Sequence, residues 1–145
     1  EYQKINIEVL KKKGGAVAWK EVDCTLLDYN LLPVFYEFGS DKLTPGAQEV
    51  IDERLVKLLN ENPYLKLELT AHTDSRGTAG RNKSLSERRA VSVANYLTSQ
   101  GISPTRLVTK GYGESRLVNR CKDGVPCSEK EHEENRRTEF RVINN

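Results

Sequence analysis

The spacing of apolar and polar residues along the chain predicts alternating strands and helices. A largely apolar run over residues 34–38 predicts a first core strand. At Thr44–Pro45, a threonine N-cap and a proline at the first helical position precede apolar residues at helical spacing, so we expect a helix that ends near Asn62–Pro63. Leu65 to Ala71 alternates apolar with polar positions, which predicts a half-buried strand.

A second helix is predicted in the middle of the chain. Ser84 and Glu87 have the spacing of a capping box, and an apolar stripe at helical spacing follows them. Gly101 is expected to end this helix. The preceding residues, Ser75 to Lys83, are polar and contain glycine, so we expect them to form a loop.

The remaining elements complete a layered fold. Leu107 to Lys110 predicts a third strand, Ser128 with Glu131 predicts a capped short helix, and alternation over residues 138–142 predicts a final strand. The resulting order is strand, helix, strand, helix, strand, short helix, strand. It predicts an α/β fold with a mixed sheet of about four strands and two main helices on one face.

Residues 1–32 differ from the rest of the chain. Two short apolar alternations, around Ile5 and Val17, flank the turn-like segment Lys11 to Gly15. We expect this region to be a hairpin or linker from a preceding domain, and residues 33–145 to form the principal domain. Because the chain starts at Glu1 and contains no methionine, we also expect it to be a piece of a longer protein.

Composition narrows the function classes. The 145 residues are 37% hydrophobic and 30% charged, which fits one globular domain and not a disordered chain. The 23 Lys and Arg residues barely exceed the 21 Asp and Glu residues, so we expect no nucleic-acid partner. The longest apolar run, Leu31 to Tyr36, is broken by Pro33 and is too short for a membrane span.

The cysteines and histidines bear on metal and nucleophile chemistry. Cys121 and Cys127 flank a short loop, and His132 is the only other zinc ligand near them, so a disulfide is the better interpretation and an oxidising compartment follows. Cys24 is interpreted as a small buried residue. His72 lies far from His132 in sequence and no metal or serine-hydrolase motif is present, so we expect no metal, no cofactor and no enzyme.

The richest candidate site begins where the second predicted strand ends. Residues 74–89 contain five basic and two acidic residues, and glycines in this stretch let the backbone approach a ligand. Arg89 can grip a carboxylate through two hydrogen bonds while Asp74 takes an ammonium group, which suits a zwitterion. The alternative is that Asp74 and Arg89 pair with each other. Arg88 and Arg136 are interpreted as parts of a solvated charged face.

Several motifs together resemble a known family. They occur in the order HTD, SRGTAGRN, LSERRAVSVANYL, GYGES and NRRTEFRV, within residues 33–143. This set resembles the carboxy-terminal OmpA-like domain, a peptidoglycan-anchoring module also found in Pal lipoproteins and flagellar MotB. The resemblance implies a noncatalytic domain that holds the peptidoglycan stem peptide by the D-centre of meso-diaminopimelate.

The resemblance also implies the ligand residues. The two defining positions of the family correspond to Asp74 and Arg89. Further contacts are carried over to positions beside the strand end, in the loop, at the helix start and before the last strand: Thr73, Asn82, Leu85 and Arg137. At Phe38–Gly39 the family often has an acid or amide after the phenylalanine, so only a backbone contact is expected there.

The implied role is to anchor a larger outer-membrane-associated protein to the cell wall. The expected partners are peptidoglycan and the other domains of that protein, and the expected location is the periplasm. The segment between Cys121 and Cys127 departs from the plain family pattern and is expected to stiffen a loop near the site. The alternative function is a protein-interaction domain of an envelope complex that keeps the fold without ligand binding.

Overall fold

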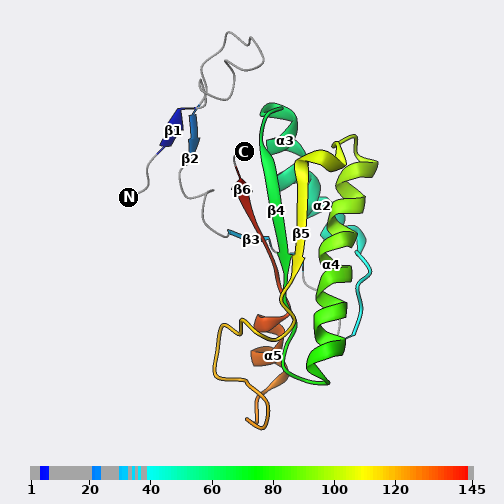
Figure 1. The fold of residues 1–145 in the computed structure, drawn as a ribbon, viewed down its shortest axis with the longest axis vertical. Coiled ribbons are helices and arrows are strands. Elements are labelled where there is room, and N and C mark those ends of the chain that lie inside the picture. The colour runs from blue at the N-terminus through cyan, green and yellow to red at the C-terminus, as the bar shows by residue number, and fades with distance from the viewer. Residues whose placement is uncertain are drawn as a thin grey trace.

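The computed structural model describes residues 4–6, 21–23, 30–32, 34, 36 and 39–143 (Figure 1). In chain order its elements are β1 (Lys4–Asn6), β2 (Glu21–Asp23), β3 (Asn30–Leu32), α2 (Pro45–Ile51), the π-helical turn η2 (Asp52–Val56), α3 (Lys57–Glu61), β4 (Lys66–Ala71), α4 (Ala79–Ser99), the 3₁₀ turn η3 (Pro104–Arg106), β5 (Leu107–Gly111), α5 (Glu129–Asn135) and β6 (Thr138–Ile143).

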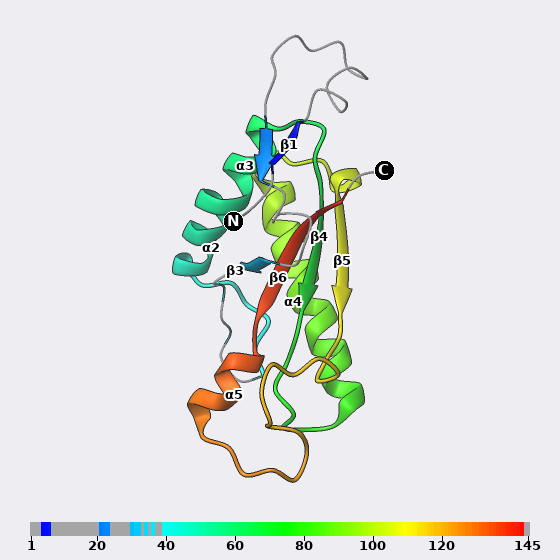
Figure 2. The same ribbon diagram turned by 90° about the vertical axis from the view of Figure 1, so that its left-hand side faces the viewer.

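These elements form the predicted mixed α/β fold. The main sheet has the strand order β3-β6-β4-β5, in which β4 and β5 are parallel and the other neighbours are antiparallel. The continuous helical stretch from α2 to α3 and the long helix α4 cover one face of this sheet (Figure 2). Strands β1 and β2 pair separately as an antiparallel two-stranded sheet.

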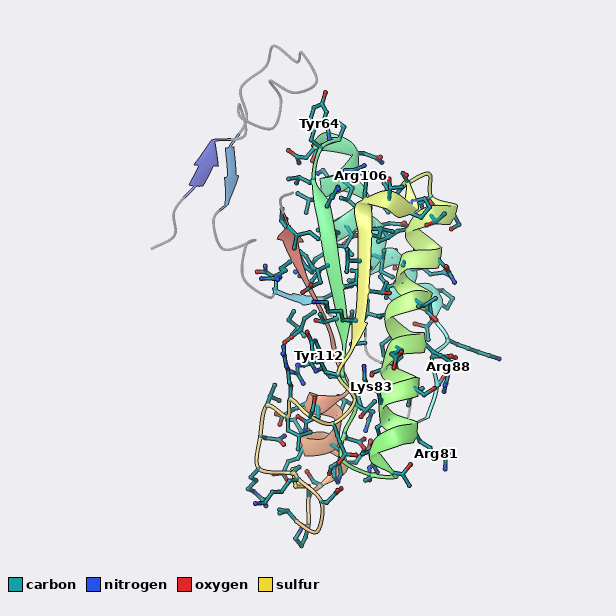
Figure 3. All side chains as sticks on the ribbon, in the orientation of Figure 1. Tyr64, Arg81, Lys83, Arg88, Arg106 and Tyr112 are labelled. Carbon is teal, nitrogen blue, oxygen red and sulfur yellow. A yellow bond between two sulfur atoms is a disulfide. The ribbon has the colours of Figure 1, made fainter. Side chains whose placement is uncertain are left out.

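The first helical stretch confirms the prediction from its caps. The Oγ1 atom of Thr44 accepts a hydrogen bond from the backbone N–H of Ala47 at 3.1 Å, and Pro45 occupies the first helical position. The helix ends at Glu61, before Asn62–Pro63. At this end Arg106 (Figure 3) donates to the carbonyl groups of Leu59, Asn62 and Leu65 at 2.8–2.9 Å, which ties the helix to the start of β5.

The predicted first core strand was wrong in its position. Strand pairing occurs over Asn30–Leu32, whereas Val34 and Tyr36 are buried without belonging to a strand. The reason lies in the partner strand, because β6 begins at Thr138, which is opposite Leu32, and offers no further residues for pairing. The apolar run was therefore correctly identified as core but not as strand.

The predicted start of the second helix was also wrong. The helix α4 begins at Ala79, with Thr78 as its N-cap, whose Oγ1 accepts from the N–H of Arg81 at 3.2 Å. Ser84 lies inside the helix and accepts a hydrogen bond from Arg88 instead of forming a capping box. The first buried residue of α4 is Asn82, so a search for an apolar stripe begins one turn too late.

The helices pack against the sheet to form a single apolar core. Its residues come from the strands, the helices and the segments between them: Leu32, Val34, Tyr36, Ala47, Ile51, Leu55, Leu59, Leu65, Leu67, Leu69, Val93, Leu97, Ile102, Phe140 and Val142. Within the described residues, no helix is both long and apolar enough to cross a bilayer. The predicted turn at residues 11–15, Val17, Cys24 and Phe38 lie outside the described residues.

We predict that Gly111→Ala will destabilise the fold by about 1 to 3 kcal/mol, because a methyl group has no space there. A Cβ atom at Gly111 would overlap the backbone N of Glu87 and the Oγ of Ser86, on the helix that packs across β5. Urea unfolding will measure the loss. Gly80→Ala is the control, since nothing lies within 4 Å of a Cβ there. Equal stability of the two variants would contradict the close packing of α4 on β5.

Candidate functional site

A cavity of about 270 Å³ lies at the end of the sheet where β4 stops and α4 begins. Its walls come from four places in the sequence: the segment before α2, the β4–α4 loop, the first three turns of α4, and the residue that precedes the last strand by two. The lining residues are Gly39, Thr73, Asp74, Arg76, Gly77, Arg81, Asn82, Ser84, Leu85, Arg88, Arg89 and Arg136.

Asp74 is a buried carboxylate in this cavity, with 2% of its side chain exposed. Its Oδ2 accepts hydrogen bonds from Arg76 and Arg136, each at 2.9 Å, and its Oδ1 accepts from the backbone N–H of Arg76 at 2.9 Å. Burial raises the pKa of Asp74, but the hydrogen bonds from both arginines outweigh it and hold the pKa below its ordinary value. Asp74 is therefore ionised at neutral pH.

Arg89 is a fully buried cation in the wall of the same cavity. Its Nε donates to the carbonyl of Ser40 at 2.8 Å, and its guanidinium lies over the ring of Tyr36, 4.6 Å from the centroid. Burial lowers the pKa of Arg89 to about 10, which still leaves it charged at neutral pH. The site thus holds a buried guanidinium whose Nε is bound to the Ser40 carbonyl.

The two defining residues do not pair with each other. The ion pairs of Asp74 are with Arg76 and Arg136, and both Asp74 and Arg89 line the cavity. The structure therefore overturns the alternative in which Asp74 and Arg89 merely neutralise one another. An acid and a guanidinium thus line one cavity, which is the pair of groups that a zwitterion needs.

The β4–α4 loop is held by Asn82, the first buried residue of α4. Its amide group donates to the carbonyl groups of Asp74 and Arg76, at 3.2 and 3.0 Å, and to Glu114 at 2.8 Å. Thr73 is fixed beside it, since its N–H donates to the carbonyl of Gly113 at 2.9 Å. The predicted residues Thr73 and Asn82 both line the cavity, and Asn82 sets the path of the loop.

Leu85 and Gly39 also line the cavity, as their predicted roles require. Leu85 supplies an apolar side chain from α4, and Gly39, at a φ of 76°, brings only backbone to the opposite wall. Phe38, the eighth residue predicted for the site, lies outside the described residues.

The structure brings Arg136 to the cavity and places Arg137 elsewhere. Arg137 donates to Glu139 at 3.1 Å and to the carbonyl of Arg116 at 2.9 Å, and it does not line the cavity. The imidazole of His72, 3.2 Å from Glu139, and the Arg137 guanidinium hold the pKa of Glu139 at about 2. This cluster lies on the other face of β6.

The interpretation of Arg136 as part of a solvated face was wrong. Its side chain is 5% exposed and is bound to Asp74. A signal for this existed in the sequence: Thr138, Phe140 and Val142 face the core, and the same two-residue alternation read backward places Arg136 on that side. Arg88, in contrast, extends outward from α4 (Figure 3) and is 55% exposed, although it reaches the cavity rim.

The cysteine loop lies beside the same site. Cys121 and Cys127 form the predicted disulfide, with their Cα atoms 6.0 Å apart, and the carbonyl of Cys121 accepts a hydrogen bond from Ser75. The predicted capping box of Ser128 and Glu131 opens α5. Among the described residues, the grouping with metal-ligand spacing is Cys121, Cys127 and Glu131, but sulfur atoms joined in a disulfide offer no thiolate.

The charge of the cavity wall favours an anionic ligand with one cationic group. Five of the lining residues are arginines and one, Asp74, is an acid. Arg81 and Arg88 stand at the exposed rim, whereas Arg89 and Arg136 are buried. Guanidinium groups bind carboxylates through paired hydrogen bonds. The site can therefore hold a carboxylate at its arginines and an ammonium at Asp74.

Comparisons with known proteins place this chain in a family. The OmpA family model matches residues 35–131. The peptidoglycan-associated lipoprotein of Pseudomonas aeruginosa is 36% identical over 107 residues, which cover 74% of this chain and 60% of that protein. Outer membrane protein A of Bordetella avium is 32% identical over 114 residues, which cover 75% of this chain and 53% of that protein. The chain thus spans somewhat more than half the length of these curated relatives.

Solved structures show the same fold. The peptidoglycan-associated lipoprotein of Burkholderia pseudomallei superposes with a TM-score of 0.67 at 22% identity, covering 76% of this chain and 88% of that one. The C-terminal domain of Helicobacter pylori MotB gives a TM-score of 0.66 at 20% identity, covering 80% and 85%. Because the family model matches more than half of its residues, the chain belongs to the OmpA family.

Proposed function

We propose that this chain binds the peptidoglycan stem peptide noncovalently by the D-centre of meso-diaminopimelate. That centre carries one free ammonium and one free carboxylate. The ammonium is placed at Asp74 and the carboxylate at Arg89, with Thr73, Asn82, Leu85 and Gly39 completing the cavity. The observation that carries the proposal is that Asp74 and Arg89 are both buried in one cavity without pairing with each other.

Family membership supports this assignment. The relatives named above include peptidoglycan-associated lipoproteins, and both motif residues of the family stand at the cavity. The chain would tether a larger outer-membrane-associated protein to the wall from the periplasm. The Cys121–Cys127 disulfide agrees with an oxidising compartment. The proposed role of the chain is binding without catalysis, since the proposed contacts to the ligand are only hydrogen bonds and ion pairs.

Co-sedimentation with purified sacculi of the diaminopimelate type tests the proposal. The intact chain is expected to pellet with the sacculi, and Arg89→Ala is expected to stay largely in solution because the ligand carboxylate loses its paired donors. Arg54→Ala, an exposed arginine on η2, is the matched control and should pellet normally. Circular dichroism of each variant checks that the fold is kept.

The outcomes separate the alternatives. If the intact chain stays in solution, the protein-interaction function becomes the better account. Normal sedimentation of a folded Arg89→Ala variant would show that the ligand binds elsewhere. Release of soluble muropeptides during the incubation, measured by chromatography, would contradict a noncatalytic role.

A further inference from the structure

Glu129 closes a ring of ionic contacts around Asp74. Arg76 and Arg136, the two guanidinium groups that bind Asp74, also donate hydrogen bonds to Glu129, at 2.9 and 2.7 Å. The ring therefore contains two carboxylates and two guanidinium groups. Glu129 is the first residue of α5, and Arg136 caps the opposite end of the same helix.

The ring has a buried side and an exposed side. The side chains of Asp74 and Arg136 are 2% and 5% exposed, whereas those of Arg76 and Glu129 are 37% and 60% exposed. The hydrogen bond from Arg136 lowers the pKa of Glu129, so Glu129 carries its charge at neutral pH. Glu129 thus contacts two arginines of the cavity lining and does not itself line the cavity.

The hydrogen bonds on Asp74 show why this second acid matters. A carboxylate offers about four acceptor positions. Asp74 accepts three hydrogen bonds within the described residues, two on Oδ2 and one on Oδ1, which leaves capacity for a ligand ammonium. Two adjacent cations work against such a ligand, because they repel its ammonium group.

We propose that Glu129 is a positioning residue that sets the specificity of the cavity for an ammonium-bearing ligand. It balances the charge of Arg76 and Arg136, and it shares the Nη2 donor of Arg76 with Asp74. Asp74 then keeps the negative potential that attracts the ammonium. This inference rests on the proposed function and adds a residue from outside the cavity to it.

The residues directly before Glu129 are held in place by a helix cap and a disulfide. Ser128 caps α5 directly before it, and the disulfide fixes Cys127 to Cys121. The carbonyl of Cys121 accepts a hydrogen bond from Ser75, which lies between Asp74 and Arg76 in the sequence. The cysteine loop therefore connects Glu129 to the segment whose charges it balances.

Calorimetric titration of two tripeptides tests the inference. One is L-Ala-γ-D-Glu-meso-diaminopimelate, and the other is the same molecule with the D-centre amino group replaced by hydrogen and its carboxylate kept. The wild-type chain is expected to prefer the first. In Glu129→Gln this preference, the ratio of the two Kd values, is expected to fall about two- to fivefold, the range of a screened ion pair.

Two further variants serve as controls. Glu129→Asp keeps the charge and is expected to retain more of the preference than Glu129→Gln. Glu133→Gln removes an exposed acid from the same helix and should leave the preference unchanged. If Glu129→Gln leaves the ratio of the two Kd values unchanged, even where both tripeptides bind more weakly, the inference is overturned while the proposed function stands. If the wild-type chain binds neither tripeptide, both are overturned.

Discussion

Asp74→Ala is expected to lower the free energy of unfolding by about 3 kcal/mol, because it leaves the buried Arg136 without its inner partner. The side chain of Arg136 is 5% exposed and forms an ion pair with Asp74 at 2.9 Å. Removing the carboxylate leaves a buried cation facing the alanine methyl group. Equilibrium unfolding in urea at neutral pH will measure the change in the midpoint.

Two other substitutions serve as comparisons for the stability of Asp74→Ala. Asp74→Asn keeps the shape of the side chain and one acceptor oxygen, so its loss is expected to be smaller than that of Asp74→Ala. Asp123→Ala removes an exposed acid from the cysteine loop and should change stability by no more than about 0.5 kcal/mol. If Asp74→Ala were as stable as Asp123→Ala, the buried ion pair with Arg136 would be contradicted.

The second large effect concerns wall chemistry. A stem peptide with lysine in place of meso-diaminopimelate lacks the D-centre carboxylate, so it offers Arg89 no anion. We expect this ligand to bind more weakly by about 1.5 to 3 kcal/mol, or ten- to over a hundredfold. Calorimetric titration with two tripeptides, one ending in meso-diaminopimelate and one ending in lysine, will give the ratio of their Kd values.

A variant of the protein at Arg89 distinguishes loss of the contact with the ligand carboxylate from a general loss of affinity. In Arg89→Lys a charge remains but the paired donors are lost, so the difference between the two tripeptides is expected to shrink. This is a double-mutant cycle in which one change is made on the protein and one on the ligand. A difference that stays the same in Arg89→Lys would show that another group reads the carboxylate.

Much of the fold was predictable because its local signals agree with one another. The helix that starts at Pro45 has its N-cap at Thr44 and its end before Pro63, and the structure confirms both. The alternation in β4 and β6 likewise identified both central strands. Asp74 and Arg89 are predicted to share one site because both lie in a basic, glycine-containing segment that follows a strand end, and because the two defining positions of the family fall on them.

The errors arose where tertiary contacts decide the structure. Strand β3 ends at Leu32 because its partner β6 starts at Thr138, which no local pattern near residue 34 reveals. The start of α4 was missed because its first buried side chain is the amide of Asn82. Glu129 is an exposed acid 53 residues from Arg76 in sequence, and only the coordinates bring them together.

The face of strand β6 on which a residue lies distinguishes Arg136 from Arg137. Arg136 and Arg137 are adjacent in sequence, but only Arg136 shares the core-facing alternation of β6. Arg137 instead shares the face of Glu139, to which it is bound. Arg136 therefore lines the cavity and Arg137 does not, so we expect Arg136 to be the nearer of the two to a ligand bound there.

A crystal structure of the chain with bound L-Ala-γ-D-Glu-meso-diaminopimelate tests the central claim most directly. We expect the D-centre ammonium within hydrogen-bond distance of the Asp74 carboxylate, and the D-centre carboxylate on the Arg89 guanidinium. A tripeptide bound outside the cavity, or one whose D-centre lies in it with neither group on these two side chains, would contradict the claim.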